Sequence, residues 1–86
     1  RAVRWYRRSA QAGDFRGMFS LATVLLERGQ AAEAEPWLAR ARKEGNVNFL
    51  KSALATLQTG GAPMAAYVQA YAEELQQRVA EETSTA

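Results

Sequence analysis

The chain has 86 residues, of which 48% are hydrophobic and 23% are charged; this is the size of one small domain and excludes a disordered polymer. It has no cysteine and no histidine, which excludes disulfides, thiolate metal sites and the usual general base. The net charge of +2 is too small to favour a polyanionic partner, although residues 1–16 carry a basic excess and residues 46–86 an acidic one.

The first predicted helix covers about residues 1–12 and combines arginines with aromatic rings. Its arginines span about 120° of a helical wheel: Arg1, Arg4, Arg7 and Arg8. A separate arc holds Ala2, Trp5, Tyr6 and Ser9. Basic residues among aromatic rings are also typical of a nucleic-acid-binding arm. Because the cations and the rings face different surroundings, the pattern favours a helix with a solvated cationic side and a buried aromatic side.

The second predicted helix is strongly amphipathic and ends at Gly29, a residue suited to a left-handed helix stop. Its apolar residues lie within about 160° of one another: Phe15, Met18, Phe19, Leu21, Ala22, Leu25 and Leu26. Its polar residues lie on the opposite side: Arg16, Ser20, Thr23 and Glu27. We expect this helix to bury one face.

A third helix is predicted over about residues 31–44, with Gly45 at its end. Its apolar stripe consists of Ala34, Trp37, Leu38 and Ala41. Pro36 lies about one turn inside the helix, where it removes a backbone hydrogen bond and is expected to bend the helix.

Two further helices bring the predicted total to five. The fourth covers about residues 47–58, and Thr59-Gly60-Gly61 breaks it. The fifth starts at Pro63, and its apolar face consists of Met64, Tyr67, Val68, Tyr71, Ala72, Leu75 and Val79. Core packing of Tyr67 and Tyr71 is favoured over a peptide-binding patch. Residues 81–86 lack periodicity and are expected to fray.

The chain contains an internal repeat of 32 residues. A shift by that length aligns these pairs: Ala2 with Ala34, Trp5 with Trp37, Arg8 with Arg40, Gly13 with Gly45, Ser20 with Ser52, Leu25 with Leu57 and Gly29 with Gly61. The chain has two tryptophans, and this register matches both of them. A period of this length is typical of helix-turn-helix solenoid units.

The repeat resembles the SLR (Sel-one-like repeat) family, a relative of tetratricopeptide repeats. That family's second helix typically reads A-x-x-W-Y-x-x-A-A-x-x-G, which is matched by Ala2, Trp5, Tyr6, Ser9, Ala10 and Gly13. Its first helix carries a small-x-aromatic-x-L-G-x-x-Y pattern, which is matched in size and spacing by Gly17, Phe19, Leu21, Ala22 and Leu25. Residues 34–45 repeat the A-x-x-W and closing-Gly signature, whereas residues 46–80 match weakly and contain no Trp.

The resemblance implies an all-α, right-handed solenoid of antiparallel helix hairpins with about two and a half repeats. Residues 1–80 would form one repeat domain: 1–13 are the second helix of a truncated repeat, 14–45 a repeat, and 46–80 a degenerate repeat with a capping helix. Trp5 and Trp37 would fill the space between neighbouring hairpins, so that truncating either to Ala costs about 3–5 kcal/mol. Gly13 and Gly45 would allow sharp reversals. The chain would be the carboxy-terminal part of a longer bacterial protein.

The same resemblance implies a non-catalytic scaffold that binds a protein or peptide on a concave face lined by the first helix of each unit. By repeat register, the expected partner contacts are Arg16, Ser20, Thr23, Glu27, Asn48, Lys51 and Ser52. Their cations, amide and hydroxyls favour an acidic segment. A simple solvated face is the alternative interpretation for each of them. Phe19, whose repeat counterpart is Lys51, belongs either to the core or partly to the inner surface.

Other functions stay open at this point. The Arg-rich first helix could bind nucleic acid, or the repeats could be a structural spacer whose exposed amino-terminal apolar edge self-associates or contacts upstream repeats. No reaction, cofactor or metal is predicted, because the serines lack an activating partner and no phosphate loop or metal-ligand set is present. No membrane span is predicted, since the longest uncharged stretch, residues 52–72, contains Gln, Thr, Gly and Pro. The sequence assigns no compartment.

Overall fold

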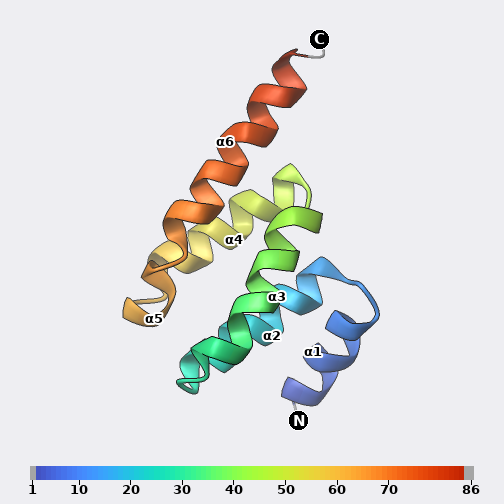
Figure 1. The fold of residues 1–86 in the computed structure, drawn as a ribbon, viewed down its shortest axis with the longest axis vertical. Helices are drawn as coiled ribbons and strands as arrows, with labels where there is room; N and C mark the ends of the chain where they lie inside the picture. The colour runs from blue at the N-terminus through green and yellow to red at the C-terminus, as the bar shows by residue number, and fades with distance from the viewer. Residues whose placement is uncertain (1, 85–86) are drawn as a thin grey trace. The chain divides into compact units, whose positions relative to one another are not determined.

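The structure, a computed structural model, describes residues 2–84, whose regular secondary structure is entirely α-helical, as predicted, with no strand. The helices are α1 (Ala2–Gln11), α2 (Phe15–Glu27), α3 (Ala31–Glu44), α4 (Val47–Thr59), α5 (Ala62–Ala65) and α6 (Val68–Ser84), as Figure 1 shows. The chain divides after Gly45 into two compact units. We call them the amino-terminal unit (α1–α3) and the carboxy-terminal unit (α4–α6), and each is described by itself.

In the amino-terminal unit, α2 packs against both α1 and α3 (Figure 1). The buried residues of α2 are Gly17, Met18, Phe19, Leu21, Ala22, Leu25 and Leu26. The neighbouring helices contribute mostly small residues to the buried set: Ala10 from α1, and Ala34, Leu38 and Ala41 from α3. Large side chains on the central helix therefore meet small ones on its neighbours, which lets the three helices approach closely.

At Gly17, α1 and α2 approach each other closely. A Cβ atom at this position would overlap the side chain of Ser9 and would lie 3.0 Å from the backbone nitrogen of Ala10. The backbone nitrogen is part of a helix and cannot move aside as a flexible side chain can. The packing of α1 on α2 therefore requires a residue without a side chain at position 17.

Both α1 and α2 end in a glycine with a left-handed backbone, at Gly13 (φ 92°) and Gly29 (φ 77°). At the end of α2, the N–H groups of Gly29 and Gln30 donate to the carbonyl oxygens of Leu26 and Leu25, at 3.0 and 2.8 Å. This is the Schellman pattern, which satisfies the last carbonyls of a helix. Gly45 differs, because its φ of −73° and ψ of 157° are extended. Gly13 therefore has a backbone that favours glycine and Gly45 does not, while the predicted sharp reversals at both residues stay predictions.

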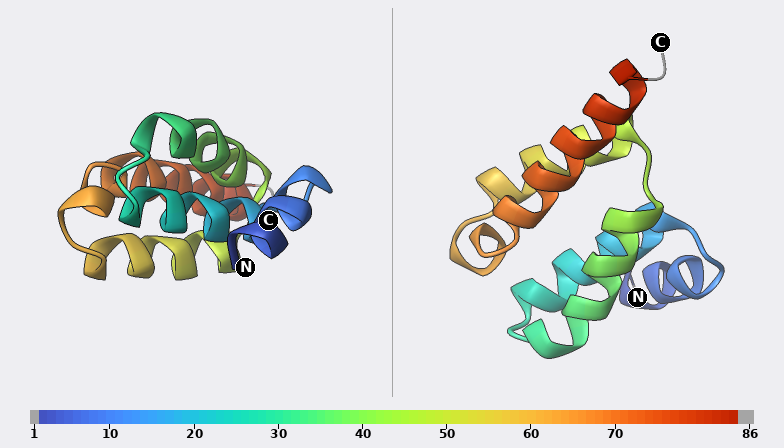
Figure 2. Two further views of the ribbon diagram at one scale, coloured as in Figure 1. Left: turned by 90° about the horizontal axis from the view of Figure 1, so that it is seen from below. Right: turned by 45° about the horizontal axis from the view of Figure 1, so that its top comes forward.

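In the carboxy-terminal unit, α4 and α6 lie side by side and run in opposite directions, as both views of Figure 2 show, and α5 lies at the turn between them. The buried residues of this unit are Phe49, Leu50, Ala53, Leu57, Met64 and Tyr71. Tyr71 has the largest of the fully buried side chains. The preference for core packing is confirmed for Tyr71, whereas Tyr67 is half-buried.

Most helix ends agree with the sequence prediction. Helix α3 has the predicted bounds and continues through Pro36, and α4 extends one residue further than predicted, to Thr59. The predicted bend at Pro36 stays a prediction. Pro63 lies in the first turn of α5, as expected from its missing N–H.

Two predictions about the last segment are wrong. The single helix expected from Pro63 onward is two helices, α5 and α6, so the described residues form six helices and not five. The N–H of Tyr67 donates to Met64, three residues back, and this tight turn separates the two helices. The fraying expected from residue 81 is also wrong up to residue 84, because α6 continues to Ser84. Residues 85–86 lie outside the described range.

The 32-residue period is visible in α2 and α4, whose first and last residues differ in number by that length. Both helices begin with a capping side chain at the matched position. Asp14 accepts a hydrogen bond from the N–H of Arg16 at 3.0 Å, and Asn46 accepts one from the N–H of Phe49 at 2.8 Å. Such caps satisfy backbone donors that a helix start leaves unpaired. The right-handed solenoid and its number of repeats stay predictions.

Candidate partner-binding surfaces

The first candidate surface is the polar stripe of α2, formed by Arg16, Ser20, Thr23 and Glu27. Residues with this spacing lie on one side of a helix. Arg16 and Glu27 are exposed at the two ends of the stripe, whereas Ser20 and Thr23 are half-buried. The Thr23 hydroxyl donates to the carbonyl oxygen of Ser20 at 2.9 Å, so its proton is already engaged. The accessible charge of this stripe is therefore positive at one end and negative at the other.

The second candidate surface is the polar stripe of α4, formed by Asn48, Lys51 and Ser52. All three residues are exposed. The backbone carbonyl oxygen of Ser52 accepts a hydrogen bond from the Thr56 hydroxyl at 3.2 Å. The stripe presents one cation, one amide and one hydroxyl, and it carries no acidic residue.

The two stripes belong to different units of the chain. The structure brings together the four residues on α2 and, separately, the three residues on α4. A single concave groove lined by both helices stays a prediction. Phe19, the aromatic residue considered for that inner surface, is buried, with 8% of its area exposed, and belongs to the core.

The third candidate surface lies on α1, where the structure corrects a prediction. Trp5 was expected to be packed between hairpins, but 70% of its area is exposed. Helix α1 has α2 as its main neighbour, and the side that carries Ala10 and Tyr6 is the covered one. Trp5 lies on the other side, so truncating it cannot cost the free energy of a buried tryptophan. Trp37, its repeat counterpart on α3, is half-buried.

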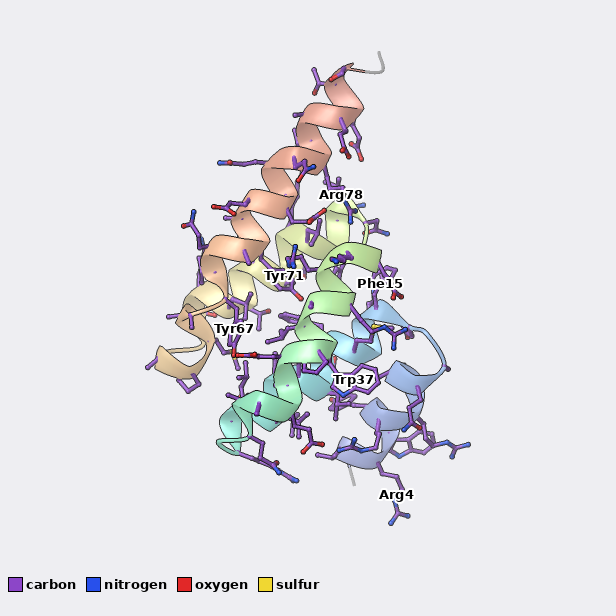
Figure 3. The ribbon with its side chains drawn as sticks, viewed as in Figure 1. Arg4, Phe15, Trp37, Tyr67, Tyr71 and Arg78 are labelled. Atoms are coloured by element: carbon purple, nitrogen blue, oxygen red, sulfur yellow. The ribbon has the colours of Figure 1, made fainter. Side chains whose placement is uncertain are left out.

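Exposed arginines share this side of α1 with Trp5. Arg4 and Arg8 are exposed, and Figure 3 shows Arg4 extending away from the helix. The guanidinium carbon of Arg8 lies 5.8 Å from the centre of the Trp5 ring, within the range of a cation–π contact. The prediction that rings and cations face different surroundings is therefore wrong for Trp5. We call Arg4, Trp5 and Arg8 the Arg–Trp surface; Arg1 lies outside the described residues.

The pairing of a tryptophan with the arginine three residues later recurs on α3. The Arg40 guanidinium lies 5.6 Å from the Trp37 ring, in the same sequence register as Arg8 and Trp5. The 32-residue repeat aligns the two Trp–Arg pairs in the sequence, and in the structure both pairs make a cation–π contact. Trp37 is half-buried on α3, whereas Trp5 exposes most of its ring to solvent on α1.

Arg7 has a partner that the sequence did not indicate. Its guanidinium lies 3.1 Å from a carboxylate oxygen of Glu33, so an ion pair joins α1 to α3. The two side chains keep 39% and 46% of their areas exposed, so the pair contributes less than about 1 kcal/mol to stability. No pattern within one helix could predict this contact, because the residues are 26 positions apart.

The described residues contain no buried polar or charged residue. They also contain no group of three or more His, Cys, Asp or Glu side chains close enough to hold a metal ion. Among the described helices, none combines the length and the apolar character that a membrane crossing requires. Residues 2–84 expose cations, carboxylates, amides and hydroxyls, and two large hydrophobic side chains, Trp5 and Val79.

Comparison of the chain with protein-family models, with curated proteins and with solved structures finds no match.

Proposed function

We propose that this chain is a non-catalytic protein-interaction module of the SLR-like helical-repeat type. It binds an acidic peptide or protein segment through the polar stripes of α2 and α4. The observation that carries this proposal is the matched pair of helices. The first residues of α2 and α4 are 32 positions apart in the sequence, and so are their last residues. Both helices begin with a side-chain cap at the matched position, and each keeps a polar side. A repeated helix with a repeated polar side is suited to an extended partner.

The chemistry of the two stripes favours carboxylates in the partner. Arg16 and Lys51 are exposed cations, and Asn48 is an exposed amide donor near Lys51 on α4. Hydrogen bonds from cations to carboxylates are stronger than those between neutral groups. Glu27 lies eleven residues after Arg16, which is about 16 Å along a helix, and it disfavours an acidic residue at that end. A partner segment would then place its acidic residues toward Arg16.

The proposal is tested by titration of a fluorescently labelled peptide of alternating Glu and Gly residues. Arg16→Ala and Lys51→Ala should each weaken binding about threefold to tenfold, which corresponds to the loss of one charge-assisted contact. Lys43→Ala is the matched control, because Lys43 is an exposed lysine on α3, outside both stripes. A peptide with Gln in place of Glu should bind far more weakly. Unchanged affinity in both stripe variants would refute the proposal.

A further inference from the structure

The residues that the structure describes expose two large hydrophobic side chains, one near each end of the chain. These are Trp5, with 70% of its area exposed, and Val79, with 42%. Trp5 lies within the Arg–Trp surface of α1, and α1 contains no acidic residue. An exposed tryptophan among cations combines a large apolar area with a charge that selects its partner.

Val79 lies in a helix of the opposite charge. Helix α6 contains four glutamates and one arginine, and it has no basic residue in its last turn. The arginine, Arg78, already pairs with Glu74 at 2.8 Å. Helix α6 has 17 residues and α4 has 13, so α6 is longer by about 6 Å and its last turns extend beyond α4 in Figure 1. Val79 lies in the second half of α6, and 42% of its area is exposed.

We propose that the Arg–Trp surface of one copy of this chain binds the carboxy-terminal half of α6 in a second copy. Trp5 packs against Val79, while Arg4 and Arg8 face the acidic side chains of α6. The contact joins two different surfaces, because two Arg–Trp surfaces placed together would bring four arginines into proximity. The dimer then keeps one unused Arg–Trp surface and one unused α6 surface, so association is head to tail and extends with concentration.

The same surface offers less to a nucleic acid. Arg7 is paired with Glu33, so the Arg–Trp surface supplies two exposed arginines, whereas binding through phosphates requires several simultaneous cation contacts. The acidic helix α6 has the charge that matches the surface, and it carries the exposed apolar residue that a phosphate backbone lacks.

The test is sedimentation velocity of the 86-residue chain over a range of concentrations, with two variants. Trp5→Ala removes the ring from the first surface, and Val79→Lys places a cation in the second. The unmodified chain should gain average mass with concentration and lose it as salt is raised from about 50 to about 200 mM. Each variant alone should be monomeric. An equimolar mixture should form dimers and stop there, because each variant retains the surface that the other lacks.

Several results would overturn the proposal. One is a chain that stays monomeric at every concentration, and another is a mixture of variants that does not dimerise. A Val79→Lys variant that still self-associates would show a symmetric Trp5 contact instead. Salt-sensitive binding of arbitrary duplex DNA that disappears in Trp5→Ala would assign the surface to nucleic acid. Thermal unfolding monitors the fold of each variant, and a large drop in the Tm of Trp5→Ala would show that Trp5 is covered within one chain.

Discussion

The two units contain matched helices, α2 and α4, whose residues align at a spacing of 32, but other helices bury α2 more than α4. Helix α2 packs against two neighbours, α1 and α3, whereas α4 packs against α6 with the short α5 at the turn. At matched positions, Phe19 is buried where Lys51 is exposed, and Leu26 is buried where Gln58 is exposed. In α2 and α4, residues close in sequence thus determine the length and ends of each helix. The number of helices packed against each one determines how wide its apolar side is.

Exchange of residues at one matched position should give the largest effect. Phe19→Lys places a charge in a buried site and should lower the free energy of unfolding by at least about 3 kcal/mol. Lys51→Phe changes an exposed position of α4 and should alter it by no more than about 0.5 kcal/mol. Urea unfolding followed by far-ultraviolet circular dichroism measures both. If both variants lost the same free energy of unfolding, the two matched positions would not differ in burial.

Gly17→Leu should cost somewhat less, about 2–3 kcal/mol, because the new side chain overlaps Ser9 and the backbone of α1. Phe49, the repeat counterpart of Gly17, shows that a large residue is accepted at the matched position of α4. Ala55→Leu is the control, since Ala55 is exposed on α4 and should tolerate the change. A Gly17→Leu variant as stable as this control would mean that α1 does not pack closely on α2.

The two capping residues should give the next effects in size, and Asp14 should contribute more than Asn46. Asp14→Ala and Asn46→Ala each remove a side-chain acceptor at a helix start and should cost about 1 kcal/mol. Asp14 also accepts a hydrogen bond from the Ser9 hydroxyl at 3.0 Å, so its loss should be the larger of the two. Asn48→Ala serves as the control, because Asn48 is an exposed asparagine of α4 that is not its cap. A cap variant as stable as this control would show that the side chain at that helix start does not act as a cap.

The smallest effect is expected for ion pairs. A double-mutant cycle on Arg7 and Glu33, which joins α1 to α3, should give a coupling below about 1 kcal/mol that decreases with added salt. The Arg78–Glu74 pair within α6 is shorter, at 2.8 Å, and less exposed, so its coupling should be the larger one. The reverse order would indicate that the contact between α1 and α3 contributes more than its exposure implies.

The sequence predicted what depends on neighbouring residues along the chain. Gly29 indicated where α2 ends, Pro63 where α5 begins, and the apolar spacing gave the bounds of α3. The break between α5 and α6 escaped prediction because the apolar spacing of Met64, Tyr67, Val68 and Tyr71 continues across the turn. The interruption is small, since Ala66 keeps helical backbone angles, φ −62° and ψ −20°.

The sequence failed where the outcome depends on which helix covers which side. Trp5 and Trp37 are the same residue type at matched positions of the repeat. Trp5 nevertheless lies on the side of α1 that faces away from α2 and is exposed, whereas Trp37 on α3 is half-buried. The polar stripes of α2 and α4 could be predicted, because periodicity assigns residues to sides of a helix. The half-burial of Ser20 and Thr23 could not, since it depends on packing around α2.

The proposed function requires one partner segment to contact the polar stripes of both α2 and α4. Its most direct test is nuclear magnetic resonance of the ¹⁵N-labelled chain during titration with the Glu-Gly peptide. The shifted amide signals should cluster at Arg16 and Ser20 on α2 and at Asn48, Lys51 and Ser52 on α4, with the same affinity at both helices. Shifts confined to α1, or to one of the two stripes, would contradict it.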